Sequence, residues 1–253
     1  MKSAIVVIGI GEIGSVFARG FLRSGHPVYP ITRDESISAT ADIIPPPELV
    51  VLAVAEADLH SVLAQIPSAW RNKLALLQNE LLPCDWQQHQ LEAPTIISVW
   101  FEKKQGQDSK VIVPSPVLGP HAELIKTGLE SIDIACNVLN NDDELLFELV
   151  RKNVYILTSN IAGIKTGGTV GELWTQHRVF ATAVANEIID LQEHLTGTTL
   201  PRNALIDGMA TAFDGDPDHK CMGRSAPVRL ARALTIAKDA DIETPQLQAI
   251  AAL

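Results

Sequence analysis

A glycine-rich motif near the start of the chain constrains its fold more than any other feature. The apolar residues 4–8 lead directly into the pattern Gly-x-Gly-x-x-Gly, whose glycines are Gly9, Gly11 and Gly14. After the motif, apolar residues recur with the period of an amphipathic helix, and Gly25 stands where a helix C-cap is expected. The sequence therefore predicts a buried strand, a tight turn and a helix.

The three glycines predict an anion-binding turn at the head of this helix. Gly9 permits the turn, Gly11 lets the backbone approach a pyrophosphate, and Gly14 lets the helix pack closely on the strand. A dinucleotide site is favoured over a merely structural turn, because the motif follows a buried strand and opens an amphipathic helix. The predicted cofactor-binding residues of the turn are Gly9, Ile10, Gly11, Glu12, Ile13 and Gly14.

A second strand, within residues 26–34, ends in Thr32, Arg33 and Asp34. In dinucleotide-binding domains this position meets the adenosine ribose. Thr32 and Arg33 favour the 2′-phosphate of NADP, because a guanidinium group matches the geometry of a phosphate. Asp34 follows immediately and would suit the 2′-hydroxyl of NAD, and Arg33 on its own is also typical of a solvated surface. We expect NADP as the cofactor.

Two more apolar runs predict parallel strands, at residues 48–55 and 73–79. Asn79 lies at the carboxyl end of the second run, where ligands bind in parallel sheets. It is either a ligand contact or a turn-forming asparagine. Further β-like runs occupy residues 95–101, 110–113 and 131–137. The alternation of strands and helices is lost there, so this part of the sheet is expected to be mixed or antiparallel.

The second part of the chain is predicted to be helical. Residues 140–143 are cap and turn formers, and they divide the chain into a domain of residues 1–140 and a helical domain of residues 141–253. In the first long helix, Lys152 and Asn160 share one stripe, about 12 Å apart along the axis. They form either a solvated edge or the lining of a polar pocket. Further helices are expected at 175–195, 201–213 and 227–240, after a glycine-rich loop at 163–171.

Composition and charge exclude several classes of partner. The chain has 30 acidic and 20 basic residues, and its net charge of −10 argues against nucleic acids and membrane surfaces. No apolar run reaches the length of a membrane span. Three cysteines at unrelated spacings favour reduced thiols and a cytoplasmic location. The aspartates of residues 214–218 do not predict a metal site, because Pro217 interrupts the loop and Ser225 replaces the closing glutamate of a calcium loop.

Together these residues resemble the ketopantoate reductase (2-dehydropantoate 2-reductase) family, of which the chain would be a divergent member. The resemblance covers most of the chain and is closest at residues 9–14, 25–33, 76–79, 148–160 and 171–173. It implies an α/β fold with an N-terminal Rossmann-type NADP-binding domain. An all-helical domain, like the C-terminal domain of 6-phosphogluconate dehydrogenase, would follow.

The resemblance also implies roles for individual residues. The glycines and Arg33 would hold NADP, and Asn79 would lie at both the cofactor and the substrate. Asn160 would contact the substrate, while Lys152 would act as general acid. Three positions depart from the family pattern of polar or acidic residues, namely Ile156, Val170 and Ser225. These departures favour a less hydroxylated or more apolar substrate than ketopantoate, or a loss of activity.

The sequence therefore predicts an NADP(H)-dependent oxidoreductase that reduces a small 2-oxo acid or a related carbonyl compound. Two alternatives stay open. One is an NADP-binding sensor or scaffold without catalysis, and the other is a related two-domain dehydrogenase of the hydroxyacid or opine type. The long helix that begins near Thr175 would serve a homodimer as well as a core.

Overall fold

The computed structural model describes residues 2–253, which divide after Glu148 into two compact units. The division lies inside helix α6 (Asp142–Thr166), whereas the sequence places the boundary just before that helix, at residues 140 and 141. Each unit has its own architecture, an α/β sheet in the first and helices in the second. Among residues 2–253, no helix combines the length and the apolar character needed to cross a membrane.

The first unit is built on a seven-stranded sheet of order β2-β1-β3-β4-β5-β8-β9. Its strands are β1 (Ile5–Ile8), β2 (Val28–Ile31), β3 (Leu49–Leu52), β4 (Leu74–Leu76), β5 (Thr95–Ile97), β8 (Ser115–Leu118) and β9 (Cys136–Val138). The first five strands run parallel, while β8 pairs antiparallel with β5 and parallel with β9. The expected mixed sheet is therefore confirmed. Strands β6 (Phe101–Glu102) and β7 (Lys110–Val111) form a separate antiparallel pair.

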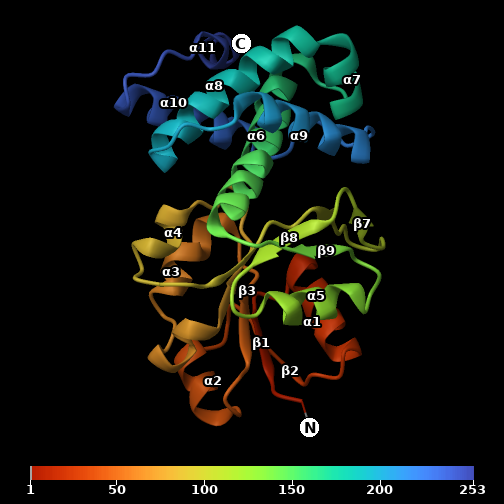
Figure 1. Cartoon of the computed structure of the whole chain (residues 1–253), viewed down its shortest axis with the longest axis vertical. Helices are drawn as coiled ribbons and strands as arrows, with labels where there is room; N and C mark the ends of the chain where they lie inside the picture. The colour runs from red at the N-terminus through yellow and green to blue at the C-terminus, as the bar shows by residue number, and fades with distance from the viewer. Residues whose placement is uncertain (1) are drawn as a thin grey trace. The chain divides into compact units, whose positions relative to one another are not determined.

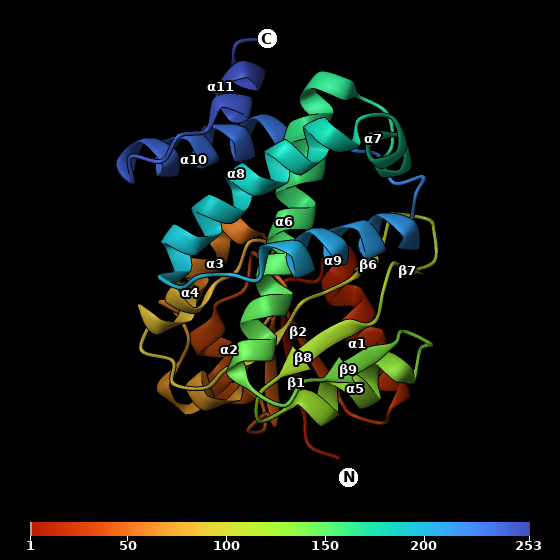
Figure 2. The ribbon, with the colours of Figure 1, turned by 45° about the horizontal axis from the view of Figure 1, so that its top comes forward.

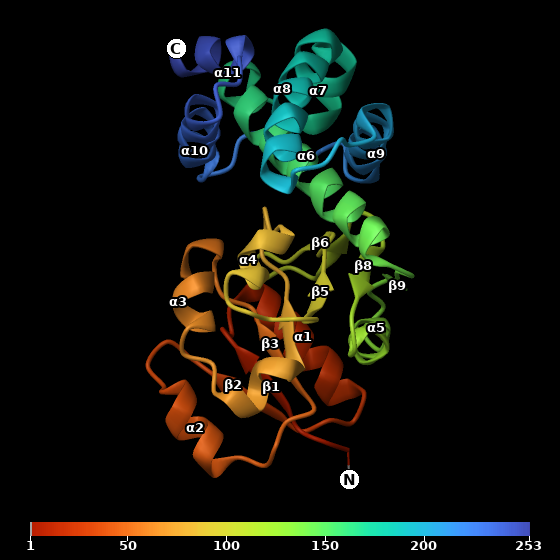
Figure 3. The ribbon, with the colours of Figure 1, turned by 60° about the vertical axis from the view of Figure 1, so that its left-hand side comes forward.

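Helices cover both faces of this sheet. They are α1 (Glu12–Arg23), α2 (Ile37–Ile43), α3 (Leu59–Leu63), α4 (Pro83–Gln87) and α5 (Ala122–Glu130), with the 3-10 turns η1 (Glu56–Asp58) and η2 (Ser68–Lys73). In Figure 1, α1 and α5 lie on one side of the sheet and α2 and α3 on the other, and Figure 3 shows the same separation. Strands β1 and β3 are buried along their whole length, which explains why their sequences are continuously apolar.

Helices α1 and α5 approach each other unusually closely. A Cβ atom added to Gly20 of α1 would lie 2.4 Å from the carbonyl oxygen of Gly128 of α5. The hydroxyl of Ser131 donates to the carbonyl of Gly20 at 2.9 Å. The rings of Phe17 and Phe21 of α1 are buried in the core of this unit. Each contributes about 1.5–3 kcal/mol to stability through the burial of apolar surface.

The sequence pattern is wrong at several places in this unit. Helix α5 and strand β8 were not expected, and residues 131–137 read as one strand although only Cys136–Val138 pairs in the sheet. Ile132 and Ile134 are buried in the turn that follows α5, so the sequence shows the apolar pattern of a strand where there is none. The glycine at position 128 weakens the helical signal of α5, but the close approach to α1 requires it.

The second unit consists of helices. Apart from α6, they are α7 (Val170–Gln176), α8 (Arg178–Thr196), α9 (Arg202–Gly215), α10 (Ala226–Asp239) and α11 (Pro245–Ala251). Helix α8 contacts α7, α9, α10 and α11 and so forms the centre of the unit (Figure 2). It is joined to α6 by a buried hydrogen bond of 2.9 Å from the Asn153 amide to Gln192.

The expected glycine-rich loop at residues 163–171 is much shorter than predicted. Helix α6 continues through Gly163 to Thr166. Gly163 serves packing and does not end the helix, since a side chain there would meet Cys221 at 2.7 Å. Gly167 and Gly168 then adopt positive φ angles, and Thr169 begins α7 with a capping box closed by Glu172. The expected long helix from about Thr175 corresponds to α8, whereas the short helix α7 before it was not expected.

A buried carboxylate joins α8 to α11. Glu187 is 7% exposed, and its two oxygens accept hydrogen bonds from the backbone nitrogens of Gln246 at 2.7 Å and Leu247 at 3.0 Å. These nitrogens lie in the first turn of α11, where backbone donors have no partner within the helix. Glu187 therefore supplies the N-terminal cap of a helix that lies almost 60 residues further along the chain.

We expect Glu187→Gln to lower the free energy of unfolding by about 1–3 kcal/mol, because the amide accepts only one of the two backbone hydrogen bonds and leaves a buried donor unpaired. Denaturant unfolding measures the change. The matched control is Glu243→Gln, an exposed glutamate just before α11, which we expect to change stability by less than about 0.5 kcal/mol. Equal effects of the two variants would contradict the capping role.

Candidate functional site

The glycine-rich turn of the first unit leaves one open position on its backbone. A Cβ at Gly9, which has a φ of +90°, would lie 2.7 Å from the carbonyl oxygen of Ala53, and a Cβ at Gly14 would lie 1.9 Å from the carbonyl oxygen of Gly9. At Gly11, by contrast, an added Cβ would meet no atom within 4 Å. Gly9 and Gly14 are thus required by packing, whereas Gly11 exposes bare backbone at the head of α1.

This head of α1 has the polarity of an anion site. Gly11 is the N-cap of α1 and makes no side-chain cap, so the backbone donors of the first turn point outward. Glu12 in that turn is negatively charged, but its carboxylate lies 3.4 Å from the ammonium group of Lys103. Ile13 packs against the apolar core of the unit.

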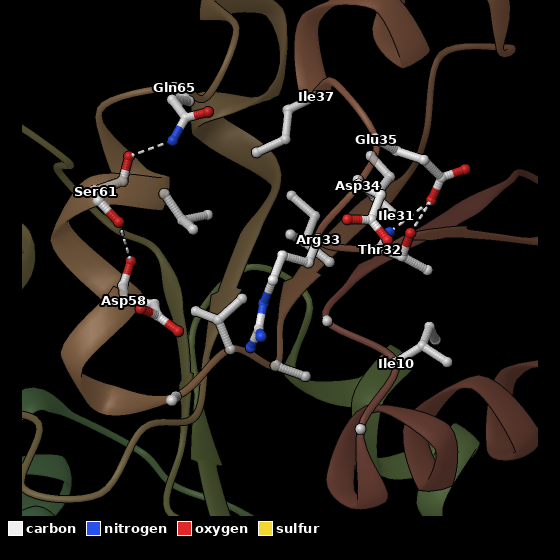
Figure 4. Close-up of a pocket in the computed structure, with 17 residues that line it drawn as sticks. Ile10, Ile31, Thr32, Arg33, Asp34, Glu35, Ile37, Asp58, Ser61 and Gln65 are labelled. Carbon is white, nitrogen blue, oxygen red and sulfur yellow. Dashed lines mark hydrogen bonds between the residues drawn. The ribbon is translucent and has the colours of Figure 1, made fainter.

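A pocket of about 950 Å³ opens beside the turn, at the carboxyl ends of β1, β2 and β3 (Figure 4). Ligands bind at these ends in open α/β sheets, and the volume lies in the range of small-molecule sites. The predicted residues that line it are Gly9, Ile10, Gly11, Thr32 and Arg33. The structure therefore brings the glycine turn and the end of the second strand to one pocket.

The end of β2 presents charges of both signs. Figure 4 shows the guanidinium group of Arg33 pointing into the pocket. The backbone nitrogen and the hydroxyl of Thr32 both donate to one carboxylate oxygen of Glu35, at 2.6 and 2.8 Å. These hydrogen bonds, first the one from the backbone, lower the pKa of Glu35. Thr32 is therefore engaged by Glu35, and this carboxylate, together with Asp34, lines the pocket beside Arg33.

The opposite wall comes from the segment after β3, which includes Asp58. Ser61 donates to the carbonyl of Asp58 at 2.9 Å, and Gln65 donates to the carbonyl of Ser61 at 2.9 Å (Figure 4). Ile37 of α2 and Val62 of α3 add apolar surface to the pocket. The only sequence signal for this wall was its position after a buried parallel strand.

Asn79 does not line this pocket. It is exposed and lies in the turn that follows β4. Its neighbour Gln78 is buried, and the Gln78 amide donates to the carbonyl of Leu52 at 2.7 Å and to that of Val54 at 3.3 Å. Gln78 thus joins the ends of β3 and β4 and fixes the place of the Asn79 turn.

In the second unit, Lys152 and Asn160 are both buried, with 6% and 8% of their surfaces exposed. A solvated helix edge is therefore wrong for this stripe of α6. Ile156 between them is buried as well, as is Val170 of α7. Ser225 is exposed at the N-cap of α10.

One charged residue of this cluster has no signal in the sequence pattern. Arg229 of α10 is 8% exposed and donates a hydrogen bond of 3.0 Å to the side-chain oxygen of Asn160. Its position is 69 residues away in the chain, so no local pattern connects the two. The second unit thus buries a lysine and an arginine–asparagine pair on and beside α6.

Comparison with known proteins identifies the fold of this chain through solved structures. No protein-family model matches the chain, and no curated protein sequence matches it. Among solved structures, 2-dehydropantoate 2-reductase from Methylococcus capsulatus is similar, with a TM-score of 0.74 and 15% identity over 98% of this chain and 94% of that one.

Two other solved structures are also similar. The dimeric ketopantoate reductase from Staphylococcus aureus has a TM-score of 0.64 and 14% identity, over 98% of this chain and 95% of that one. D-mandelate dehydrogenase with NADH has the same TM-score and identity, over 98% and 96%. The fold implied by the resemblance to ketopantoate reductases is therefore confirmed, with an N-terminal α/β part and a helical C-terminal part.

Proposed function

We propose that this chain is an NADP(H)-dependent oxidoreductase that reduces a small 2-oxo acid or a related carbonyl compound. The observation that carries the proposal is the bare backbone of Gly11 at the head of α1, which opens on a pocket lined by Arg33. An added Cβ at Gly11 meets no protein atom, so this glycine is not explained by packing within the protein. A pyrophosphate against the backbone donors of α1 does explain it.

The residues of the pocket suit a phosphorylated dinucleotide. The first turn of α1 would bind the pyrophosphate, and the guanidinium group of Arg33 would bind the 2′-phosphate of NADP. Ile37 and Val62 offer apolar surface for the adenine ring. The cofactor, when bound, supplies the hydride.

The protein's own contribution to the reaction would come from three polar residues. In the proposed mechanism the ammonium group of Lys152 stabilises the negative charge that develops on the carbonyl oxygen and donates a proton to it. Asn79 and Asn160 hold the substrate by neutral hydrogen bonds. Ile156 and Val170 are apolar, so the proposal favours a substrate that is less hydroxylated than ketopantoate.

The structural neighbours support the substrate class and the assembly. Their names denote enzymes of 2-dehydropantoate and of D-mandelate, which are a 2-oxo acid and a 2-hydroxy acid. Both compounds carry a carboxylate next to the carbon that exchanges the hydride. The Staphylococcus aureus reductase is described as dimeric, and we extend the homodimer to this chain as part of the proposal.

A second candidate is an NADH-dependent hydroxyacid dehydrogenase. Glu35 and Asp34 favour it, because two carboxylates beside Arg33 repel a 2′-phosphate. The neighbouring D-mandelate dehydrogenase was solved with NADH.

We expect Gly11→Ala to keep the fold and to lose the cofactor. Its free energy of unfolding should change by less than about 0.5 kcal/mol, because the φ of −74° suits alanine and nothing lies near the new methyl group. Its dissociation constant for NADPH should rise at least about tenfold, because the methyl group occupies the path of the pyrophosphate. Denaturant unfolding and calorimetric titration measure the two effects.

The matched variant is Gly14→Ala. It should lower the free energy of unfolding by about 3 kcal/mol or more, because its methyl group collides with the backbone of Gly9. If Gly11→Ala binds NADPH as tightly as the wild type, the proposed cofactor site is wrong.

Lys152→Ala should reduce the turnover of a responsive 2-oxo acid by about 100-fold or more, since general acid catalysis typically contributes that much. Its affinity for NADPH should not change. The rate of NADPH oxidation across a panel of 2-oxo acids measures the effect, and Lys165→Ala, an exposed lysine of the same helix, is the control.

Unchanged turnover in Lys152→Ala would remove this lysine from the mechanism. A wild-type protein that binds NADPH but oxidises it with no carbonyl compound would favour a sensor without catalysis.

The choice between NADPH and NADH should respond in opposite directions to two substitutions. Arg33→Gln should weaken NADPH binding about tenfold and leave NADH binding nearly unchanged, because it removes a charge-assisted hydrogen bond to the 2′-phosphate. Glu35→Gln should strengthen NADPH binding, because it removes a negative charge from the same end of the pocket. Titrations of both variants with NADPH and with NADH measure these two effects. Equal changes in the affinities for NADPH and NADH would contradict the prediction.

A further inference from the structure

Arg229 holds the Asn160 amide in one orientation. The hydrogen bond from its Nη1 atom to the Asn160 Oδ1 atom is 3.0 Å long, and both residues are buried. A guanidinium group has donors only, so the amide oxygen and not the nitrogen must face Arg229. Gly223, just before α10, lies on the same side, because a Cβ added to it would be 3.3 Å from that oxygen.

The other edge of the amide is therefore a donor. Within residues 2–253, no group accepts a hydrogen bond from the Asn160 Nδ2 atom. This nitrogen is not among the polar atoms that are completely sealed from solvent without a partner, so an incoming oxygen has access to it. A donor on a residue that is only 8% exposed is costly unless a partner reaches it.

We propose that Arg229 is a positioning residue, which fixes Asn160 so that its amide NH₂ group faces the substrate and selects a carboxylate. This inference rests on the proposed function, because it assigns the substrate of that reaction to the same helix, α6. It assigns a role at the proposed site to the hydrogen bond between Arg229 and Asn160.

The chemistry of the cluster supports an anionic substrate. Lys152 and Arg229 offer only donors, and the orientation imposed on Asn160 makes its open edge a donor as well. A carboxylate has only acceptors, and hydrogen bonds to a charged acceptor are stronger than those to a neutral one. An ester or amide of the same 2-oxo acid lacks the charge and presents fewer acceptors.

The simplest competing explanation is that the hydrogen bond between Arg229 and Asn160 only fastens α10 to α6. Asn160→Asp separates the two explanations. The substitution preserves shape and the acceptor oxygen that faces Arg229, and turns that contact into an ion pair. On the other edge it replaces the donor with an acceptor that repels a carboxylate. A fastening role therefore predicts intact binding, and the positioning role predicts its loss.

The experiment uses the full chain with saturating NADPH and the unreactive acid anilino(oxo)acetate, which is bound in a structure of D-mandelate dehydrogenase. We expect Asn160→Asp to leave the melting temperature unchanged or raised, and to raise the dissociation constant of the acid at least about tenfold. Calorimetric titration and thermal unfolding are the measurements. An unchanged dissociation constant, or no binding to the wild type, overturns the inference.

Two substitutions at Arg229 test the positioning step itself. A glutamine both donates and accepts hydrogen bonds, so Arg229→Gln allows the Asn160 amide to rotate by a half-turn and exchange its oxygen and nitrogen. Arg229→Lys keeps a donor in place. The readout is the ratio of kcat/KM for a 2-oxo acid to kcat/KM for its methyl ester. We expect Arg229→Gln to lower this ratio about tenfold through the KM of the acid, and Arg229→Lys to restore most of it.

Failure of the inference and failure of the proposed function give different results. If the wild type reduces 2-oxo acids but Asn160→Asp and Arg229→Gln leave their KM unchanged, the function stands and the positioning role is wrong. If the wild type reduces none, the function is wrong, and the titration with anilino(oxo)acetate alone decides whether Asn160 binds a carboxylate.

Discussion

The first unit depends on the contact between α1 and the strand that precedes it. Gly14 lies so close to the carbonyl of Gly9 that even a methyl group would not fit, and Gly9 in turn lies against the backbone after β3. This packing fixes the direction in which α1 points its unpaired backbone donors. The pocket at the carboxyl ends of β1, β2 and β3 exists because that direction is fixed.

The second unit places several polar side chains in its interior, and some of them join its helices. Glu187 receives two backbone donors of α11, and the Asn153 amide bonds Gln192. Asn160 is held through its oxygen, which accepts a hydrogen bond from Arg229. In the proposal, the open donor edge of this amide binds the carboxylate of the substrate.

Local patterns in the sequence predicted those parts of the fold whose cause is local. The spacing of Gly9, Gly11 and Gly14 and the change of period after them are enough to predict the strand, the turn and α1. Helix α5 was missed, because its Gly128 is explained by the approach of the Phe21 ring of α1, more than a hundred residues earlier. The buried isoleucines after α5 imitated a strand, since burial and strand pairing leave the same apolar signal.

By itself the sequence determined an α/β unit with a glycine-rich turn after its first strand, a helical second unit, and a lysine and an asparagine on one stripe of a long helix. Only the tertiary structure decided that this stripe is buried, that Glu35 engages Thr32, and that Arg229 orients Asn160. Backbone conformation follows from residues a few positions apart, and so it can be read along the chain. The polarity of a site follows from which edge of each side chain is already occupied, and that depends on residues that only folding brings together.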